Sequence, residues 1–175
     1  MKKIVSFLLI SFSFLSCEKD DICDATTPTT PRLVIEFYDN SIATPTLKSV
    51  TNLKAVASGM SEGVVFNTSL PVINPSRYLF NGNKIYLPLN PSATTTTYSL
   101  KYDFGSASEN EDVVTYNYTT QEVYISRACG YKYLFNLTNT SSNILSVDSN
   151  NWIKNIIIAK PNLESENEVH IKMFF

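Results

Sequence analysis

The segment Thr97-Tyr-Ser-Leu-Lys-Tyr-Asp-Phe104 decides the fold class of this chain. Aromatic or aliphatic residues occupy every second position, and polar residues lie between them. Because successive side chains of a β-strand point to opposite faces, this alternation predicts a strand with one buried face. The same pattern recurs in segments 33–38, 84–89 and 169–175, so the chain is expected to consist of strands.

Other segments rich in β-branched and aromatic residues predict further strands, and no window has the periodicity of an amphipathic helix. These candidates are 46–57, 63–67, 112–119, 122–127, 131–138 and 152–159. Asn81-Gly-Asn83 suits a tight hairpin turn, Asn-Pro at 74–75 and 90–91 suits the start of a turn, and 161–167 is a polar loop. The pattern predicts one all-β domain, an Ig-like β-sandwich of roughly nine or ten strands, with a barrel as the alternative.

Length and charge suit one domain that does not bind nucleic acid. With 175 residues, 43% of them hydrophobic, the chain can bury one core, whereas two domains would each have a thin one. The formal net charge of −2 argues against nucleic acid, whose phosphates attract basic surfaces. The five glycines are dispersed and form no phosphate-binding loop.

The first 16 residues have the parts of a secretory signal peptide. Lys2 and Lys3 precede an apolar stretch over 4–15, and Ser16 precedes Cys17. Twelve residues of helix would span about 18 Å, too little for a bilayer core of about 30 Å. Phe-Leu-Ser-Cys at 14–17 resembles a bacterial lipobox, which implies acylation of Cys17 and cleavage before it. An ordinary signal peptide followed by an unrelated cysteine is the alternative.

Glu18-Lys19-Asp20-Asp21 follows this cysteine and resembles the export signal of Bacteroidota lipoproteins. The resemblance implies an outer-membrane lipoprotein that Lys19, Asp20 and Asp21 direct to the cell surface. A polar tether facing the periplasm is the alternative. The expected organisation is a signal peptide over 1–16, a lipidated tether over 17–31 and the β-domain over 32–175.

Cys23 and Cys129 remain, an even number in an oxidising compartment, and we expect them to form a disulfide. It would close a loop of more than 100 residues and stabilise the fold by up to about 4–5 kcal/mol. It would also leave only 17–22 as a free tether, about 20 Å when extended. The alternative makes Cys129 a nucleophile with His170 as its base.

The rest of the sequence shows no catalytic constellation, and we expect no cofactor and no metal site. Alternation with Val169 and Ile171 places His170, the one histidine, on the solvent face of its strand. Aromatic rings suit the apolar faces of sugars. The best candidates for such a ligand face are Tyr86, Tyr116, Tyr118 and Tyr124.

One segment, Glu122–Phe135, has Arg127-Ala-Cys-Gly130 at its centre. Together with segments 31–39 and 84–90, it resembles an uncharacterised lipoprotein family of Bacteroidota, a domain of unknown function. The resemblance covers nearly the whole mature chain and implies an envelope lipoprotein without an established activity. It supplies no catalytic residues.

Physically, Arg127-Ala-Cys-Gly130 suits an interruption of a strand, with Gly130 at a bulge. Alternation places Arg127 among apolar neighbours, where its charge needs a partner. We expect a structural ion pair with Glu36, with an anion site as the alternative.

These features predict a non-catalytic accessory or binding module anchored at the outer membrane. The expected partners are the membrane, through the lipid, and an outer-membrane protein or a glycan. The alternatives are a glycan-binding lipoprotein of a nutrient-uptake system, a structural subunit of an outer-membrane protein, and a small envelope hydrolase. Carboxylates for the hydrolase would come from Asp39, Asp103, Glu111, Asp112 and Glu122.

Overall fold

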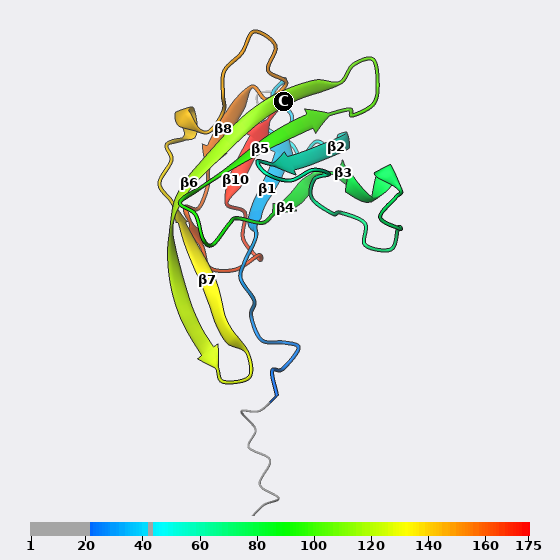
Figure 1. Ribbon diagram of the computed structural model, residues 1–175. Helices are drawn as coiled ribbons and strands as arrows, with labels where there is room; N and C mark the ends of the chain where they lie inside the picture. Colours follow the sequence, from blue (N-terminus) through cyan, green and yellow to red (C-terminus); the bar gives the residue numbers. More distant parts are fainter. Residues whose placement is uncertain (1–21, 42–43) are drawn as a thin grey trace, which may run out of the picture.

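The computed structural model describes residues 22–41 and 44–175, whose strands form two sheets packed face to face (Figure 1). The predicted all-β sandwich is confirmed. The signal peptide, Cys17 and the export signal Lys19-Asp20-Asp21 lie outside the described residues. Within the described ranges, no helix is long and apolar enough to cross a bilayer.

One sheet has four strands in the order β4-β1-β10-β8, and the other has six in the order β3-β2-β5-β6-β7-β9. The strands are β1 Leu33–Tyr38, β2 Val50–Ala57, β3 Leu79–Gly82, β4 Lys84–Leu87, β5 Thr95–Tyr102, β6 Asn110–Ser126, β7 Gly130–Leu137, β8 Asn155–Ile158, β9 Asn162–Leu163 and β10 Ile171–Phe174. Two short 3-10 helices, η2 (Pro75–Tyr78) and η3 (Ser141–Asn143), lie in the connections.

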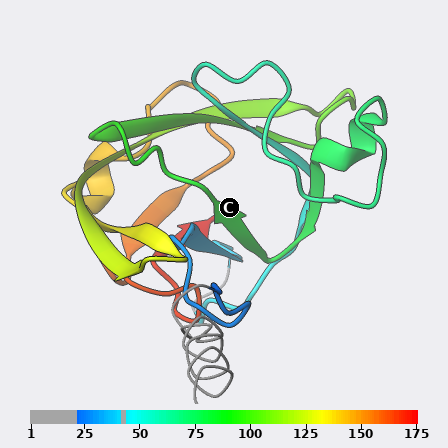
Figure 2. The ribbon, with the colours of Figure 1, turned by 60° about the horizontal axis from the view of Figure 1, so that its bottom comes forward.

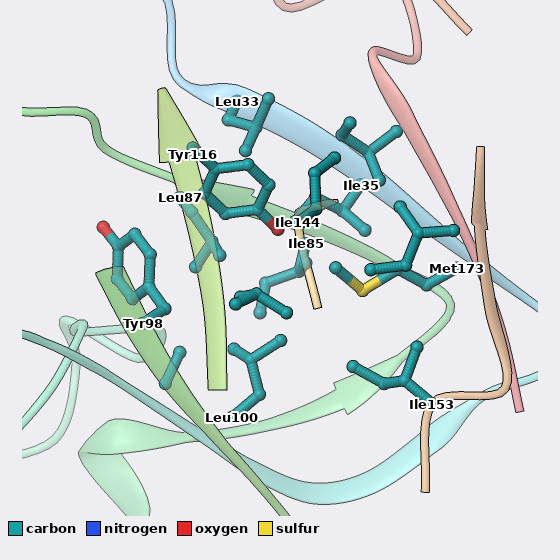
Figure 3. Packing of buried hydrophobic residues seen from close by; sticks show 14 of the residues in the cluster. Leu33, Ile35, Ile85, Leu87, Tyr98, Leu100, Tyr116, Ile144, Ile153 and Met173 are labelled. Atoms are coloured by element: carbon teal, nitrogen blue, oxygen red, sulfur yellow. The ribbon is translucent and has the colours of Figure 1, made fainter. Parts of the chain in front are cut away.

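The core lies between the two sheets and is filled by alternate residues of the strands. In β5, Tyr98 and Leu100 point inward, as the alternation predicts. Ile35, Ile85 and Met173 of the four-stranded sheet belong to the same buried cluster (Figure 3). Each fully buried side chain of this kind contributes about 1.5–3 kcal/mol, so this double layer is the main stabilising feature of the domain.

The first and last strands lie side by side at the centre of the four-stranded sheet. β1 pairs with β10 in parallel, with Ile35 opposite Ile171 and Phe37 opposite Met173. β4 and β8 flank this pair on either side. The sheet therefore needs both ends of the described chain.

Several expected strands differ from the observed ones. The segment 63–67 forms no strand, and the strand expected over 46–57 begins only at Val50. The two strands expected over 112–119 and 122–127 are one continuous strand, β6. The short strands β3 and β9 were not expected, because four and two residues carry too little alternation to detect.

The turn at Asn81-Gly82-Asn83 does not form the predicted hairpin. Gly82 ends β3 in the six-stranded sheet, whereas Lys84 begins β4 in the other sheet. Gly82 has a φ of +153°, and a Cβ there would lie 2.8 Å from Cζ of Phe80. The segment therefore carries the chain from one sheet to the other, and both its positive φ and the nearby Phe80 ring favour glycine at this position.

The Asn-Pro pairs start turns, as predicted. Asn74 caps η2, since its Oδ1 accepts a hydrogen bond from the Ser76 amide at 3.0 Å. Asn90 does the same for the Ser92 amide, also at 3.0 Å. In both cases the asparagine oxygen satisfies an amide that the turn leaves free.

The second half of β6 and all of β7 form a long two-stranded ribbon that projects from the sandwich (Figure 1). β5 pairs with β6 as far as Asn117, and from Tyr118 onward β6 pairs with β7. β9 pairs with β7 only at Phe135 and Asn136, near the base of the ribbon. At about 3.3 Å per residue, the ribbon extends some 26 Å from Tyr118 to Ser126.

Candidate functional site

The disulfide between Cys23 and Cys129 joins the N-terminal segment to the turn of the β6–β7 ribbon. The two Cα atoms lie 4.9 Å apart, across a sequence separation of 106 residues. Thr30 adds a second attachment, because its Oγ1 accepts a hydrogen bond from the Tyr133 amide at 3.0 Å. Seen from the ribbon end, the N-terminal segment runs beside β7 (Figure 2). The predicted pairing is confirmed, and a paired Cys129 is no thiol nucleophile.

The segment Arg127–Gly130 is the turn of the ribbon. β6 ends at Ser126, β7 begins at Gly130 with a φ of +70°, and the register shifts between Tyr124 and Ser126. The Cys129 amide donates to Oγ of Ser126 at 3.1 Å. The expected strand interruption is confirmed and is a hairpin turn, whereas the irregularity of the register lies in β6, between Tyr124 and Ser126, and not at Gly130.

The expected ion pair between Arg127 and Glu36 is wrong. Arg127 is exposed in the ribbon turn, so its charge needs no buried partner. Glu36 in β1 pairs instead with Nζ of Lys84 at 2.8 Å and accepts the Tyr38 hydroxyl at 2.8 Å. Burial opposes ionisation of Glu36, but these two hydrogen bonds outweigh it and lower the pKa of its carboxyl.

Two of the four tyrosines expected on a ligand face are buried, so that assignment was wrong for them. Tyr116 is fully buried in the core, and burial raises the pKa of its hydroxyl (Figure 3). The Tyr118 hydroxyl contacts Oγ1 of Thr96 at 2.6 Å and donates to the Asn90 carbonyl at 2.8 Å. Both side chains therefore stabilise the sandwich and are not available to a ligand.

The other two tyrosines reach the surface in different places. Tyr86 is half-buried under the Arg32 guanidinium, whose Cζ lies 4.9 Å from the ring centroid. Tyr124 is 59% exposed on the ribbon and packs edge-on against Tyr131, with ring centroids 5.3 Å apart. Tyr131, 58% exposed, was missed by sequence reasoning. Tyr131 lies directly opposite Tyr124 in the ribbon. This pairing predicts that the two side chains share a face, but it can be derived only when the position of the turn between them is known.

His170 is fully buried, contrary to the solvent position expected from alternation. Its Nδ1 accepts a hydrogen bond from the Val34 amide at 2.9 Å, which places the proton of the neutral ring on Nε2. Burial lowers the pKa of His170, and nearby Lys160 acts in the same direction, whereas Glu168 and Glu166 oppose them. The side chain fastens β1 to the segment before β10 and has no access to a substrate.

The five carboxylates considered for a hydrolase each have local contacts of their own. These contacts are Ser41 and Lys48 for Asp39, Ser106 and Ser108 for Asp103, Ser99 and Lys101 for Glu111, Asn151 and two backbone amides for Asp112, and Tyr133 for Glu122. Asp112 is fully buried, and burial raises the pKa of its carboxyl against the effect of its donors. Over 22–41 and 44–175, no three His, Cys, Asp or Glu side chains gather as metal ligands would.

An open pocket of about 450 Å³ lies on the sandwich, lined from segments 57–60, 88–90 and 95–98. Its lining is uncharged and mixes hydroxyls with apolar groups such as Met60 and Leu89. The Tyr98 hydroxyl at this pocket donates to the Pro88 carbonyl at 2.5 Å. Such a lining can hold a small neutral ligand but offers no acid, base or nucleophile of unusual reactivity.

The sequence model of a family of unknown function, DUF6452, matches residues 56–175. The chain belongs to this family. No curated protein and no solved structure matches the chain. The DUF6452 match runs from the end of β2 to the C-terminus, so Cys129 lies inside it, whereas Cys23 and β1 precede it. The disulfide thus ties the segment before the matched region to the ribbon within it.

Proposed function

We propose that this DUF6452 protein is a non-catalytic lipoprotein of the cell envelope, anchored in the outer membrane through Cys17, that serves as an accessory or binding module. The observation that carries this proposal is the disulfide at Cys23, six residues after Cys17. Disulfides persist in oxidising compartments, and a signal peptide would deliver the chain to one. Lipidation would hold the folded domain within about 20 Å of its bilayer.

The contacts of the charged side chains support binding over catalysis. Glu36, Glu166 and Glu111 form ion pairs with lysine or arginine. General acid–base catalysis needs a titratable group within hydrogen-bond reach of a substrate. Asp112 and His170 are fully buried, and they accept hydrogen bonds from the backbone amides of Ile153 and Val34.

The sequence around Lys19-Asp20-Asp21 supports exposure on the outer face of the membrane, because it resembles the export signal of Bacteroidota lipoproteins. From that position, the loops and the open pocket would contact an outer-membrane protein or a glycan. The lipid would keep the module close to such a partner and raise its effective concentration there.

Protease treatment of intact cells tests this proposal. We expect the wild type to be digested and Lys19→Ala/Asp20→Ala/Asp21→Ala to be protected, with both proteins in the membrane fraction. Ser61→Ala/Glu62→Ala, in an exposed loop of the domain, is the matched control and should behave like the wild type. Protection of the wild type would contradict surface exposure, and a wild type found in the soluble fraction would contradict the lipid anchor.

A further inference from the structure

The tip of the ribbon, residues 124–131, exposes two aromatic side chains to solvent. The Tyr124 and Tyr131 rings are each more than half exposed and pack against one another on one face of the ribbon. An exposed cation, Arg127, lies in the turn between them. Tyrosine combines an apolar ring with a polar hydroxyl, and for this reason it is enriched where membranes meet water.

The disulfide brings this tip close to the end of the chain that would carry the lipid. Cys129 at the tip is bonded to Cys23, and Cys23 is six residues from Cys17. Six residues span at most about 20 Å, less than the length of the ribbon itself. Ile22, at the start of the described chain, is 76% exposed and lies at the same end.

The opposite end of the molecule lies far from that anchor. β6 begins at Asn110, whose side chain donates to the Asn150 carbonyl, and it ends at the ribbon turn. Its 17 residues at about 3.3 Å each give a path of roughly 50 Å along the curved strand between the loop 146–151 and the tip. Figure 1 shows that loop and the ribbon turn at opposite ends of the molecule.

From this arrangement we infer that the ribbon tip rests on the lipid surface that holds the anchor, with Tyr124 and Tyr131 in the headgroup layer. The inference depends on the proposed lipidation of Cys17. Three contacts then orient the domain: the acyl group, the tyrosine pair and the Arg127 cation, which attracts anionic headgroups. The loop 146–151 points away from the membrane and toward whatever the protein meets.

Quenching of an introduced tryptophan tests this inference on the mature acylated chain. The chain is reconstituted in vesicles of phosphatidylethanolamine and phosphatidylglycerol that contain a lipid with a nitroxide near its headgroup. Tyr124→Trp places an indole at the tip, and Val147→Trp, at a position 83% exposed, places one in the far loop. The native Trp152 is buried near the start of β6 and contributes a constant background.

We expect the nitroxide lipid to quench the emission from Tyr124→Trp and to leave that from Val147→Trp unchanged. If the nitroxide lipid quenches neither variant on a chain whose mass shows acylation, the inference is overturned and the lipoprotein proposal still stands. A chain without acyl groups overturns both.

Trypsin cleavage after Arg127 provides a second measurement, in which the wild type with both tyrosines is compared with a variant that lacks them. The vesicle-bound wild type should be cleaved there more slowly than the same protein in detergent. Tyr124→Ser/Tyr131→Ser should lose this protection while keeping its circular dichroism spectrum, because both side chains lie outside the core. Equal cleavage of the wild type on vesicles and in detergent would also overturn the inference.

Discussion

At the scale of single residues, Asp112 is a fully buried acidic residue whose carboxyl group has three hydrogen-bond donors. Its carboxylate accepts hydrogen bonds from the amides of Trp152 and Ile153 and from the Asn151 side chain. This network ties the loop that precedes β8 to the inner face of β6. Removing the acceptor leaves buried donors unsatisfied, at a cost of about 1–3 kcal/mol for each group.

Asp112→Ala is therefore expected to lower the free energy of unfolding by about 3 kcal/mol or more, measured by urea denaturation. Glu111→Ala is the matched control, because Glu111 is the next residue of the strand and is exposed. Its surface contacts with Ser99 and Lys101 predict a loss below about 1 kcal/mol. Equal losses for the two variants would contradict the structural role of Asp112.

Burial of His170 predicts a pH dependence of stability. The folded protein resists protonation, because burial lowers the pKa of this ring below its ordinary 6.5. The unfolded chain therefore binds more protons below that pH, and stability must fall as the pH drops from about 7 toward 5. Lys160, Glu166 and Glu168 are the charged groups near the ring.

His170→Asn should flatten this pH dependence, because asparagine does not titrate and its side-chain oxygen can still accept the Val34 amide. The measurement is urea denaturation of both proteins at pH 7 and pH 5. A wild type with the same slope as the variant would mean that His170 keeps its ordinary pKa.

At the scale of elements, the disulfide determines how firmly the N-terminal segment is held. Its loop of about 100 residues predicts that Cys23→Ser/Cys129→Ser lowers the free energy of unfolding by up to about 4–5 kcal/mol. Thermal unfolding of the two proteins measures the loss. Unchanged stability would show that the strand contacts alone hold this segment.

The elements also show which parts of the structure alternation could reveal. The period of two assigned the inner face of β5 correctly, because one face of that strand packs on the core. The same rule applied to β6 places Tyr116 and Tyr118 with Val114 inside, opposite Thr115 and Asn117, so the signal for their burial was in the sequence.

The position of His170 could not be read from alternation. Its strand does turn that face away from the core, but the segment around Glu166 lies over it, fixed by an ion pair with Arg32 at 2.6 Å. Coverage by the loop that directly precedes the strand leaves no trace in the alternation of the strand itself. The ion-pair partner of Glu36 could not be predicted either, because it depends on the register between β1 and β4. In that register Glu36 lies opposite Lys84.

At the scale of the whole molecule, the four-stranded sheet depends on a strand outside the family match. β1 lies between β4 and β10, and its residues Leu33, Val34, Ile35 and Phe37 are fully buried. At about 1.5–3 kcal/mol for each side chain, their loss equals much of the 5–15 kcal/mol that stabilises a typical domain.

A fragment of residues 56–175 is therefore expected to be unfolded, whereas a chain of residues 23–175 should fold. The amide proton spectrum of each chain distinguishes the two states by its dispersion. The 56–175 fragment lacks β1 and also most of β2, so a folded fragment would mean that the two sheets form without either strand.

The proposed function requires a mature chain that begins at an acylated Cys17 and is closed by the Cys23–Cys129 bond. The mass of the protein isolated from membranes, beside that of Cys17→Ala, tests this most directly. The expected mass is that of residues 17–175 with added acyl groups, reduced by the two hydrogens that disulfide formation removes. A chain that begins at another residue, or one with an unmodified Cys17, would contradict it.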